Sequence, residues 1–489
     1  KILQNSIKKK IFSSYQLKID EKKLVPINNL NFIKNTYTDI WNHLTFLRII
    51  KHLRLRNVKT IKKGYSYFDT NSDVDFQKGK NNTFDFLISI YELLFAKLAF
   101  RFNRIILESF SFSTKEFLKL SIKNRLIPSL YKNLFEDIGS KKDLDFERRK
   151  IDLKSIKENK FNDKFLDFLL ENLVYDLPMS YFENFLKIKN KMSYLANKKK
   201  LIISMRSWNY NDQFKICAAE LKKKESKYFT CEHGGGLMGE YIHPKNFIGK
   251  ISSHIHYDSD NSYKKKLFRL SPTINVIDHT EIDTKKNVNL NITFLEGLKY
   301  SHKLTSLAKA EEGIDQIKEL LKFVENLPIR IKDKVILRSK RPFTLNIKDH
   351  FTKKFGKYRF NDWEQIFFDY AKTSKLMIVN YPQTAFSSLM YYNVPTILIC
   401  NKKFWFFKKE SLKMFNLLKK NKMAFENFED AERHIIKNWD GIYHWWNNKK
   451  IQNIRKLYLK NFFNIKNNWF EEWLNFISIQ KKKLFKIYH

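Results

Sequence analysis

The sequence is poor in cysteine and in glycine, and these shortages exclude several classes of protein. Its three cysteines are odd in number and have no metal-like spacing, which fits a reducing cytoplasm and argues against a disulfide framework. They stand at Cys217, Cys231 and Cys400. No G-x-S-x-G elbow occurs, which argues against a hydrolase. No Gly-Lys-Ser/Thr follows a glycine cluster, as it would in a Walker loop.

Long apolar runs are also missing. No stretch reaches 18 apolar residues without a charge, so no segment predicts a transmembrane helix. The nearest candidate, 84–100, contains Asp85, Glu92 and Lys97 and predicts a buried amphipathic helix. Hydrophobic residues nevertheless make up 43% of the 489-residue chain, which is enough for sizeable cores in more than one domain.

Charge, in contrast, is abundant and of one sign. The formal net charge is +41, from 92 Lys and Arg against 51 Asp and Glu. Three explanations stay open: a footprint for nucleic acid, attraction to an anionic membrane or substrate, and the Lys-, Asn-, Ile- and Phe-rich composition of an AT-rich genome. The basic residues are spread along the whole chain, which argues against nucleic acid, because nucleic-acid binding favours a patch or a motif.

The order of periodic segments predicts the fold class. Residues 1–200 are mostly helical in pattern, and beyond them short apolar runs alternate with helices as in β-α-β units. Strands are predicted at 201–205, 228–233, 291–297, 334–339, 375–380 and 395–400, and helices at 212–227, 313–327, 363–374 and 384–393. Two such series predict an α/β chain with two doubly wound, Rossmann-like domains facing a cleft, and extra N-terminal and C-terminal helices.

We place the domain boundaries where the predicted pattern of helices and strands changes. Residues 1–270 form a helical plus α/β acceptor-side domain, 271–440 an α/β nucleotide-donor domain, and 441–489 helices that pack back across the domains. In such sheets ligands bind beyond the carboxyl ends of the strands, so the loops after 228–233 and 375–380 are the places to look for a site. Near the C-terminus, an apolar stripe at helical spacing predicts core packing: Phe462, Ile465, Trp469, Trp473 and Phe476.

The first of these loops contains the densest glycine cluster of a chain with only 12 glycines. His233 follows a predicted strand and precedes Gly234, Gly235 and Gly236, which permit an unusual backbone path. A histidine is the natural general base at neutral pH, and Glu232 beside it could orient the imidazole. The alternative is a tight turn with a structural histidine.

The second loop, 380–398, leads from a predicted strand into a helix. Thr384, Ser387 and Ser388 stand in the first turn of that helix, directly after Gln383. Hydroxyls and NH groups at a helix N-terminus are suited to bind phosphate, and we assign all four residues to donor phosphate binding. Thr384 could equally serve as the helix N-cap, and the two roles are compatible.

Basic residues follow other predicted strands. Arg338 ends the strand at 334–339 and could neutralise a diphosphate or a sugar carboxylate. Weaker candidates are Arg206, Lys340 and Arg341, because charge runs are usually solvated. His254 and His256 alternate along a probable strand and could form half a metal site, but no companion ligand stands at a suitable spacing. We therefore expect no metal and no cofactor.

Several stretches together resemble a known family: "NDQFKICAAE" (211–220), "EHGGGLMGE" (232–240), "SKLMIVNYPQTAFSSLMYYNVPTIL" (374–398) and "DGIYHWWNNKKIQNIR" (440–455). They are similar to bacterial transferases of surface-polysaccharide and O-antigen gene clusters. The hallmarks of that group are a Gln-His-Gly-Gly-Gly turn, a "T-x-F" before an "N-x-Pro-Thr" strand, and a tryptophan pair. They correspond here to His233–Gly236, Thr384 with Phe386, Asn393 with Pro395 and Thr396, and Trp445 with Trp446.

The layout is also similar to the teichoic-acid glycerophosphotransferases, and both resemblances imply the two-domain GT-B fold. In the latter group a histidine of the N-terminal domain acts as base, and hydroxyls of the C-terminal domain hold the donor phosphates. The chain departs from the first group at Glu232, where glutamine is usual, and at Ser388, where many members have a glutamate that could hold a ribose. These departures leave the donor open.

The resemblance implies a metal-independent GT-B glycosyltransferase that moves a sugar from a nucleotide-activated donor, such as a CMP-linked ulosonic acid, to a glycan or lipid-linked glycan acceptor. One alternative is a glycerophosphotransferase-like transfer from a CDP-linked donor. Another, of a different class, is a non-catalytic basic protein that binds nucleic acid. We expect no nucleic acid partner and a cytoplasmic protein, with peripheral contact to the anionic inner membrane left open.

Overall fold

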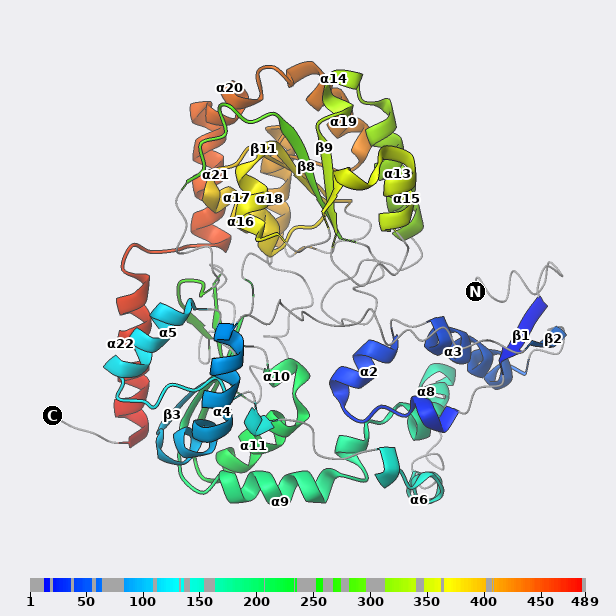
Figure 1. Ribbon diagram of the computed structural model, residues 1–489, viewed down its shortest axis with the longest axis vertical. Coiled ribbons are helices and arrows are strands. Elements are labelled where there is room, and N and C mark those ends of the chain that lie inside the picture. The colour runs from blue at the N-terminus through cyan, green and yellow to red at the C-terminus, as the bar shows by residue number, and fades with distance from the viewer. Residues whose placement is uncertain are drawn as a thin grey trace. The chain divides into compact units, whose positions relative to one another are not determined.

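The structure is a computed structural model of the chain, shown in Figure 1. It describes residues 13–17, 21–36, 39–54, 59–63, 83–108, 112–131, 133–135, 141–153, 163–205, 207–232, 234, 252–257, 267–273, 281–295, 313–339, 347–361, 365–401, 407 and 409–485. Contacts divide the chain into two compact units. The first contains 1–96, 131–198 and 207–224, and the second contains 97–130, 199–206 and 225–489.

The first unit is mainly helical. It contains α2 (Asn29–Thr36), α3 (Asp39–His52), α6 (Phe146–Asp152), α8 (Lys164–Asp176), α9 (Phe185–Leu195), α10 (Ser207–Tyr210), α11 (Asp212–Lys223) and the parallel pair β1 (Ser13–Leu17) and β2 (Lys59–Lys63). Helix α8 starts where Asp163 caps the NH groups of Phe165 and Leu166, and it ends before Pro178.

Two buried carboxylates hold this unit together. Asp212 at the start of α11 accepts hydrogen bonds from Asn29 N (2.7 Å), Ser180 Oγ (2.7 Å) and Tyr181 Oη (2.6 Å). Burial, reinforced by that carboxylate, raises the pKa of Tyr181. Glu183 forms a two-point ion pair with Arg149, at 2.9 and 2.6 Å, and both side chains are almost fully buried.

We expect Glu183→Gln to lower the free energy of unfolding of this unit by about 3 kcal/mol, because it leaves the buried Arg149 guanidinium without a counter-charge. Urea unfolding followed by circular dichroism measures the change. The matched control is Asp152→Asn, which breaks the exposed pair between Arg148 and Asp152 (3.3 Å) and is expected to cost less than about 1 kcal/mol. Equal effects of the two variants would show that burial does not set the strength of the Arg149 pair.

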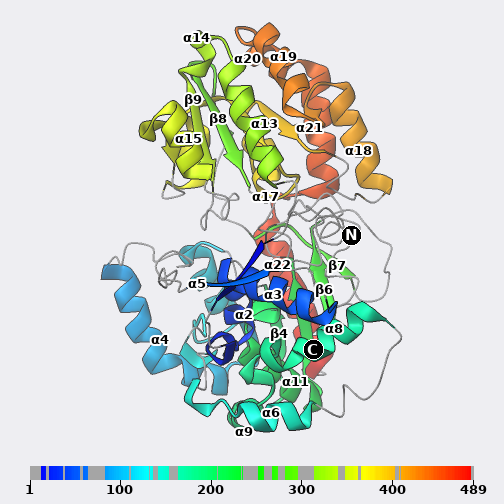
Figure 2. The ribbon, with the colours of Figure 1, turned by 90° about the vertical axis from the view of Figure 1, so that its right-hand side faces the viewer.

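The second unit contains a five-stranded parallel sheet with the order β3-β4-β5-β6-β7. Its strands are β3 (Ile105–Glu108), β4 (Leu201–Ser204), β5 (Lys227–Cys231), β6 (Ser253–His256) and β7 (Leu267–Arg269). The strands follow one another in chain order, so this order contains no reversal. One face packs on α5 (Thr114–Lys123) and α22 (Trp469–Phe485) in a single apolar cluster, and Figure 2 shows α22 in red.

The second unit also contains a six-stranded parallel sheet with the order β10-β9-β8-β11-β12-β13. Its strands are β8 (Asn289–Phe294), β9 (Val335–Ser339), β10 (Phe360–Asn361), β11 (Ser374–Val379), β12 (Thr396–Ile399) and β13 (Ala424–Phe425). One face packs on α13 (Gly313–Asn326), α15 (Ile347–Phe355) and α19 (Phe428–Asn438). The other packs on α16 (Phe367–Lys372), α17 (Thr384–Tyr392), α18 (Lys409–Lys420) and α21 (Lys449–Phe462). The short helices α14 (Ile329–Lys332) and α20 (Ile442–Asn447) complete this part (Figure 1).

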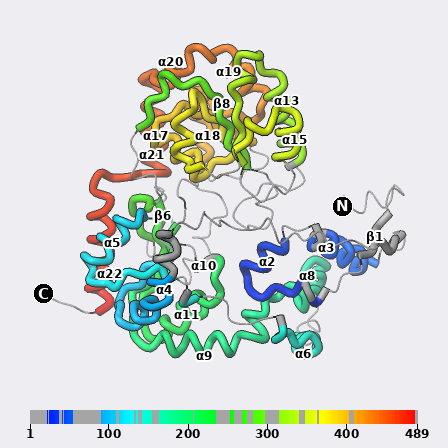
Figure 3. The backbone as a smooth tube through the Cα atoms, in the orientation of Figure 1, coloured from blue at the N-terminus to red at the C-terminus, as the bar shows by residue number. Residues whose placement is uncertain are grey.

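The predicted fold class is confirmed: the chain is α/β, with two parallel sheets of Rossmann-like character. The domain boundaries at 270 and 440 stay predictions. The apolar stripe near the C-terminus does not form one helix, because α21 ends at Phe462 and α22 starts at Trp469, as the trace in Figure 3 shows. Phe462 packs in the cluster of the six-stranded sheet, whereas Trp473 packs in that of the five-stranded sheet.

The helix predicted at 84–100 is present as α4 (Thr83–Phe102), but the prediction that it is buried is wrong. Leu93 and Leu94 are 70% and 65% exposed, whereas Glu92, directly before them in the sequence, is buried. Hydrophobic periodicity shows that the two faces of a helix differ, but it does not show which face the protein covers. No helix in the described ranges is long and apolar enough to span a bilayer.

Candidate functional site

The six-stranded sheet has a point where its strand order reverses. Numbered along the chain from β8, its order is 3-2-1-4-5-6, the order of dinucleotide-binding folds. The chain therefore proceeds from β8 toward β9 and β10 on one side, and from β11 toward β12 and β13 on the other. The loops that leave β8 and β11 diverge at their carboxyl ends, which is where such sheets bind ligands.

Asn380 fixes the two diverging loops to each other. It directly follows β11, and its side chain accepts a hydrogen bond from Leu295 N (2.7 Å) and donates one to Leu295 O (2.9 Å). Leu295 directly follows β8, so one amide side chain satisfies both polar groups of a buried residue beyond the sheet. This clamp gives the start of the second predicted loop a defined position at the reversal point.

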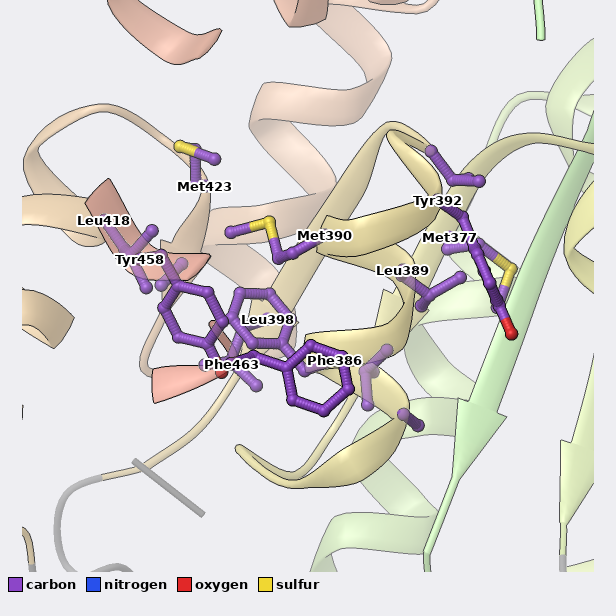
Figure 4. Packing of buried hydrophobic residues seen from close by; sticks show 14 of the residues in the cluster. Met377, Phe386, Leu389, Met390, Tyr392, Leu398, Leu418, Met423, Tyr458 and Phe463 are labelled. Atoms are coloured by element: carbon purple, nitrogen blue, oxygen red, sulfur yellow. The ribbon is translucent and has the colours of Figure 1, made fainter. Parts of the chain in front are cut away.

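The helix that follows, α17, is held by apolar packing on most sides. All of its residues from Ala385 to Met390 are buried, and so is Tyr392. Figure 4 shows Phe386, Leu389 and Met390 of α17 among side chains of β12 and α21, with Phe386 stacked edge-on against Tyr458. Such packing leaves the helix little freedom to shift, so its N-terminus is a rigid feature of the loop.

The C-terminus of α17 explains two motifs of the sequence. Asn393 ends the helix in the left-handed conformation (φ 61°), a common C-terminal cap. Trp446 Nε1 donates to Asn393 O (3.0 Å) and to its Oδ1 (2.9 Å), and Gln452 Nε2 also donates to that Oδ1 (3.1 Å). Asn393 and the fully buried Trp446 therefore form one structural unit that anchors α17 to the C-terminal helices.

At the N-terminus of α17 the structure corrects one assignment. The N-cap residue is Gln383, whose side chain makes no capping hydrogen bond, and Thr384 is the first helical residue instead of the cap. Thr384 is partly exposed, whereas Ser387 and Ser388 are buried. Ser388 Oγ donates to Thr384 O (2.8 Å), and Ser387 Oγ lies 2.7 Å from Tyr458 Oη. Their roles toward a ligand stay predictions, but both hydroxyls have partners within the protein.

Because its hydroxyl is buried against Tyr458, we expect Ser387→Ala to affect stability more than donor binding. Losing this buried hydrogen bond should lower the free energy of unfolding by about 1–2 kcal/mol. The KM for the donor should change by less than about threefold. Tyr458→Phe removes the other partner and should have the same profile. A tenfold rise in the donor KM for Ser387→Ala alone would instead assign Ser387 to the donor.

Arg338 lies near the end of β9, next to the reversal point. Its side chain is buried, donates from Nη1 to Asn361 Oδ1 (3.0 Å) and packs over the rings of Tyr370 and Phe367. Burial lowers the pKa of Arg338 to about 10, an effect that Tyr370 and Tyr381 partly offset. Arg338 is therefore a cation at neutral pH, held in a low-dielectric part of the sheet where its charge is weakly screened.

The glycine loop comes close to α17. A Cβ atom added to Gly234 would lie 2.1 Å from Thr384 Oγ1 and 3.2 Å from Thr384 Cβ. Both residues belong to the second unit, so the structure brings together the two loops that the sequence singles out. Glycine is required at 234 for this approach, because any side chain there would overlap Thr384.

Glu232 anchors the start of the same loop. Its backbone NH donates to Ile255 O (2.9 Å), and its carboxylate accepts from Tyr257 N (2.9 Å), both at the end of β6. The buried Glu232 therefore ties β5 to the segment after β6. Its predicted role in orienting His233 stays a prediction. A glutamine, usual in the family with the Gln-His-Gly-Gly-Gly turn, could accept the same hydrogen bond.

Six predicted residues lie outside the residues that the structure describes: Arg206, His233, Gly235, Gly236, Lys340 and Arg341. Of the two alternating histidines, His254 is fully buried, and its Nδ1 lies 2.9 Å from Thr230 Oγ1. Within the described ranges, no cluster of three or more His, Cys, Asp or Glu side chains could hold a metal ion. The expectation that no metal is needed stays untested.

The sequence analysis missed a buried polar row in the five-stranded sheet. Glu108, Ser204, Thr230 and His254 are in register on four neighbouring strands and are all almost fully buried. Ser204 Oγ donates to Glu108 Oε2 (2.7 Å), next to the contact between Thr230 and His254. Glu108, Ser204 and Thr230 each end or nearly end an apolar run, whereas His254 follows two serines, so the sequence signals only part of the row. The row lies in the sheet that carries the glycine loop.

Comparison with known proteins identifies the chain at the level of a family. The LIC12162 family of transferases matches residues 1–477. A search of curated proteins found no match. Because the family match spans almost all of the 489 residues, the chain belongs to the LIC12162 family transferases, and it is an enzyme that transfers a chemical group.

Proposed function

We propose that this transferase is a GT-B glycosyltransferase that moves a sugar from a nucleotide-activated donor to a glycan acceptor of the bacterial surface. The observation that carries the proposal is the approach of Gly234 to Thr384 Oγ1 at the reversal point of the six-stranded sheet. A loop with a candidate base thereby lies beside a helix N-terminus suited to phosphate. For a transfer between two bound substrates, the base and the groups that hold the donor phosphates must belong to one site.

In this proposal the donor phosphates lie at the N-terminus of α17. Thr384 Oγ1 and the first NH groups of the helix would donate hydrogen bonds to them, supported by the helix dipole. The nearby cation of Arg338 would stabilise the negative charge that develops on the leaving nucleotide. These groups can act without a metal ion, because helix N-termini and fixed cations supply the same electrostatic stabilisation.

The acceptor hydroxyl would be activated by His233, whose imidazole is basic enough to take a proton near neutral pH. The hydroxyl oxygen attacks the anomeric carbon of the donor sugar as its bond to the phosphate oxygen breaks. The proton goes to the imidazole, and the nucleotide leaves with the electron pair of the broken bond. Gly234 leaves the space that the histidine loop needs beside α17.

The donor is tested with the free nucleotides CMP, CDP, UDP and GDP in a thermal-shift assay. A nucleotide present at 100 times its Kd stabilises the protein by about 2.7 kcal/mol, which is readily measured as a rise in Tm. One nucleotide is expected to stand out. Activated sugars that carry it, including a CMP-linked ulosonic acid, are then assayed for turnover with glycan acceptors. No shift with any of the four, and no turnover, would contradict the proposal.

The second candidate keeps the site but transfers a phosphoalcohol, and the layout shared with teichoic-acid glycerophosphotransferases favours it. Turnover of CDP-glycerol, with no turnover of sugar nucleotides, would select it. A nucleic-acid-binding protein without catalysis rests on the +41 charge alone. Tight binding to nucleic acid that weakens steeply with salt, without any nucleotide-induced rise in Tm, would support this nucleic-acid-binding function.

A further inference from the structure

Helix α4 exposes a continuous apolar face. Its exposed residues recur at steps of three and four from Ile90 to Phe102, so they form one stripe along the helix. The apolar members are Ile90, Leu93, Leu94, Phe95, Leu98 and Phe102, of which Leu93, Leu94 and Phe102 are each more than 60% exposed. An ordinary surface helix turns such a stripe toward the core and its charges toward water.

The charged residues of α4 are divided between its two faces by sign. Lys97 and Arg101, the charged residues of the stripe, are both basic and both exposed, whereas the acidic Glu92 is buried on the opposite side. That opposite side is fixed to the protein: Lys200 Nζ lies over the ring of Phe100 (5.2 Å) and donates to Asn103 O (2.7 Å) just after the helix. The apolar and basic stripe is therefore the exposed face of an anchored helix.

We propose that this face of α4 inserts into the interfacial layer of an anionic membrane. Leu93, Leu94, Leu98 and Phe102 would enter the boundary between headgroups and acyl chains. Lys97 and Arg101 would extend their charged ends to lipid phosphates while their stems stay among the apolar side chains. A helix with leucine and phenylalanine between cations, and no acidic residue on the same face, matches that layer in both polarity and charge.

Charge decides between a membrane and a second copy of this chain. Two α4 faces that met would bring four cations together, since each face contributes Lys97 and Arg101. The chain as a whole carries +41, so self-association is further disfavoured. An anionic bilayer is attracted by the same charge. The inference does not depend on the proposed reaction, because its readout is binding.

The test is co-sedimentation of the full chain with vesicles of phosphatidylcholine alone and of phosphatidylcholine with 30% phosphatidylglycerol. We expect the wild type to bind the anionic vesicles. Leu94→Gln/Leu98→Gln should bind at least tenfold more weakly, because two apolar side chains that enter the membrane are replaced by polar ones. Lys97→Gln/Arg101→Gln should bind anionic vesicles about 25-fold more weakly, at about fivefold for each basic residue. The matched control is Leu186→Gln on α9, whose leucine is 66% exposed and is expected to have no effect.

Insertion itself is read with an environment-sensitive fluorophore on Leu94→Cys, since the three natural cysteines are buried and react slowly. A blue shift on anionic vesicles is expected. Three results would overturn the proposal. The wild type could fail to sediment with anionic vesicles, or the double leucine variant could sediment as the wild type does. The wild type could also be a dimer in solution that Leu94→Gln makes monomeric, in which case a second copy covers α4.

Discussion

Gly234→Ala is expected to reduce transfer activity at least about 100-fold while changing Tm by only a few degrees. The added Cβ would lie 2.1 Å from Thr384 Oγ1, which is far inside van der Waals contact. Thr384 Cβ and Cγ2 would also lie close to the added atom, at 3.2 and 3.4 Å, but the severe overlap is with the hydroxyl. Since α17 is packed on most sides, the glycine loop must move, and a displacement near 1 Å can cost about 100-fold in rate. Single-turnover kinetics measure the loss.

A double-mutant cycle makes this prediction specific. Thr384→Ala removes Oγ1, so the overlap falls to a contact that small adjustments absorb. Gly234→Ala should therefore cost much less activity in a Thr384→Ala background than in the wild type. The control is Gly441→Ala, where the nearest atom to an added Cβ is Asn438 O at 3.8 Å, an ordinary contact. Additive effects of the two changes would mean that Gly234 and Thr384 are not coupled.

His233→Ala is expected to lower the rate of the chemical step on the order of 100-fold or more, because a positioned general base contributes about 10²–10⁴-fold. Donor binding should be unaffected, since the phosphates are assigned to α17. The wild-type rate should rise with pH as the base loses its proton and then level off. The variant should lose this dependence.

His444 on α20 provides the control for the histidine prediction, because its side chain is exposed and it belongs to neither of the two candidate loops. His444→Ala should retain wild-type rate and pH profile. A His233→Ala rate within about threefold of wild type would remove His233 from the catalytic role. The same result would leave the donor side of the proposal standing, because nucleotide binding is measured separately.

Much of the fold follows from local sequence patterns. Strands of parallel sheets are buried on both faces and appear as short apolar runs, which is why β4, β8, β9, β11 and β12 were predicted within a few residues of their bounds. The site loops were equally visible, because polar residues follow these runs. The glycine stretch holds one more signal: 234–239 has the G-x-G-x-x-G spacing. That spacing carries weight only where a strand precedes and a helix follows, and β5 precedes it.

Contacts between distant residues could not be predicted in the same way. Ser387 and Thr384 look alike in sequence, but only the structure shows Tyr458, 71 residues away, beside the Ser387 hydroxyl. The strand order that creates the reversal point depends on pairing between segments far apart in the chain, which local periodicity does not encode. The exposed side of α4 was missed for a related reason, because its partner surface, not its own pattern, decides which face is buried.

The affinity of Thr384→Val for the nucleotide that gives the largest thermal shift tests the proposed donor site most directly. Valine keeps the branched shape beside Gly234 and replaces the hydroxyl with a methyl group, which cannot donate a hydrogen bond. Isothermal titration calorimetry of the wild type and the variant is expected to show binding weakened about 10- to 100-fold, the cost of a hydrogen bond to a charged phosphate. A Tm without nucleotide within a few degrees of the wild type would show that the variant is folded. An affinity equal to that of the wild type would contradict a donor phosphate at the N-terminus of α17.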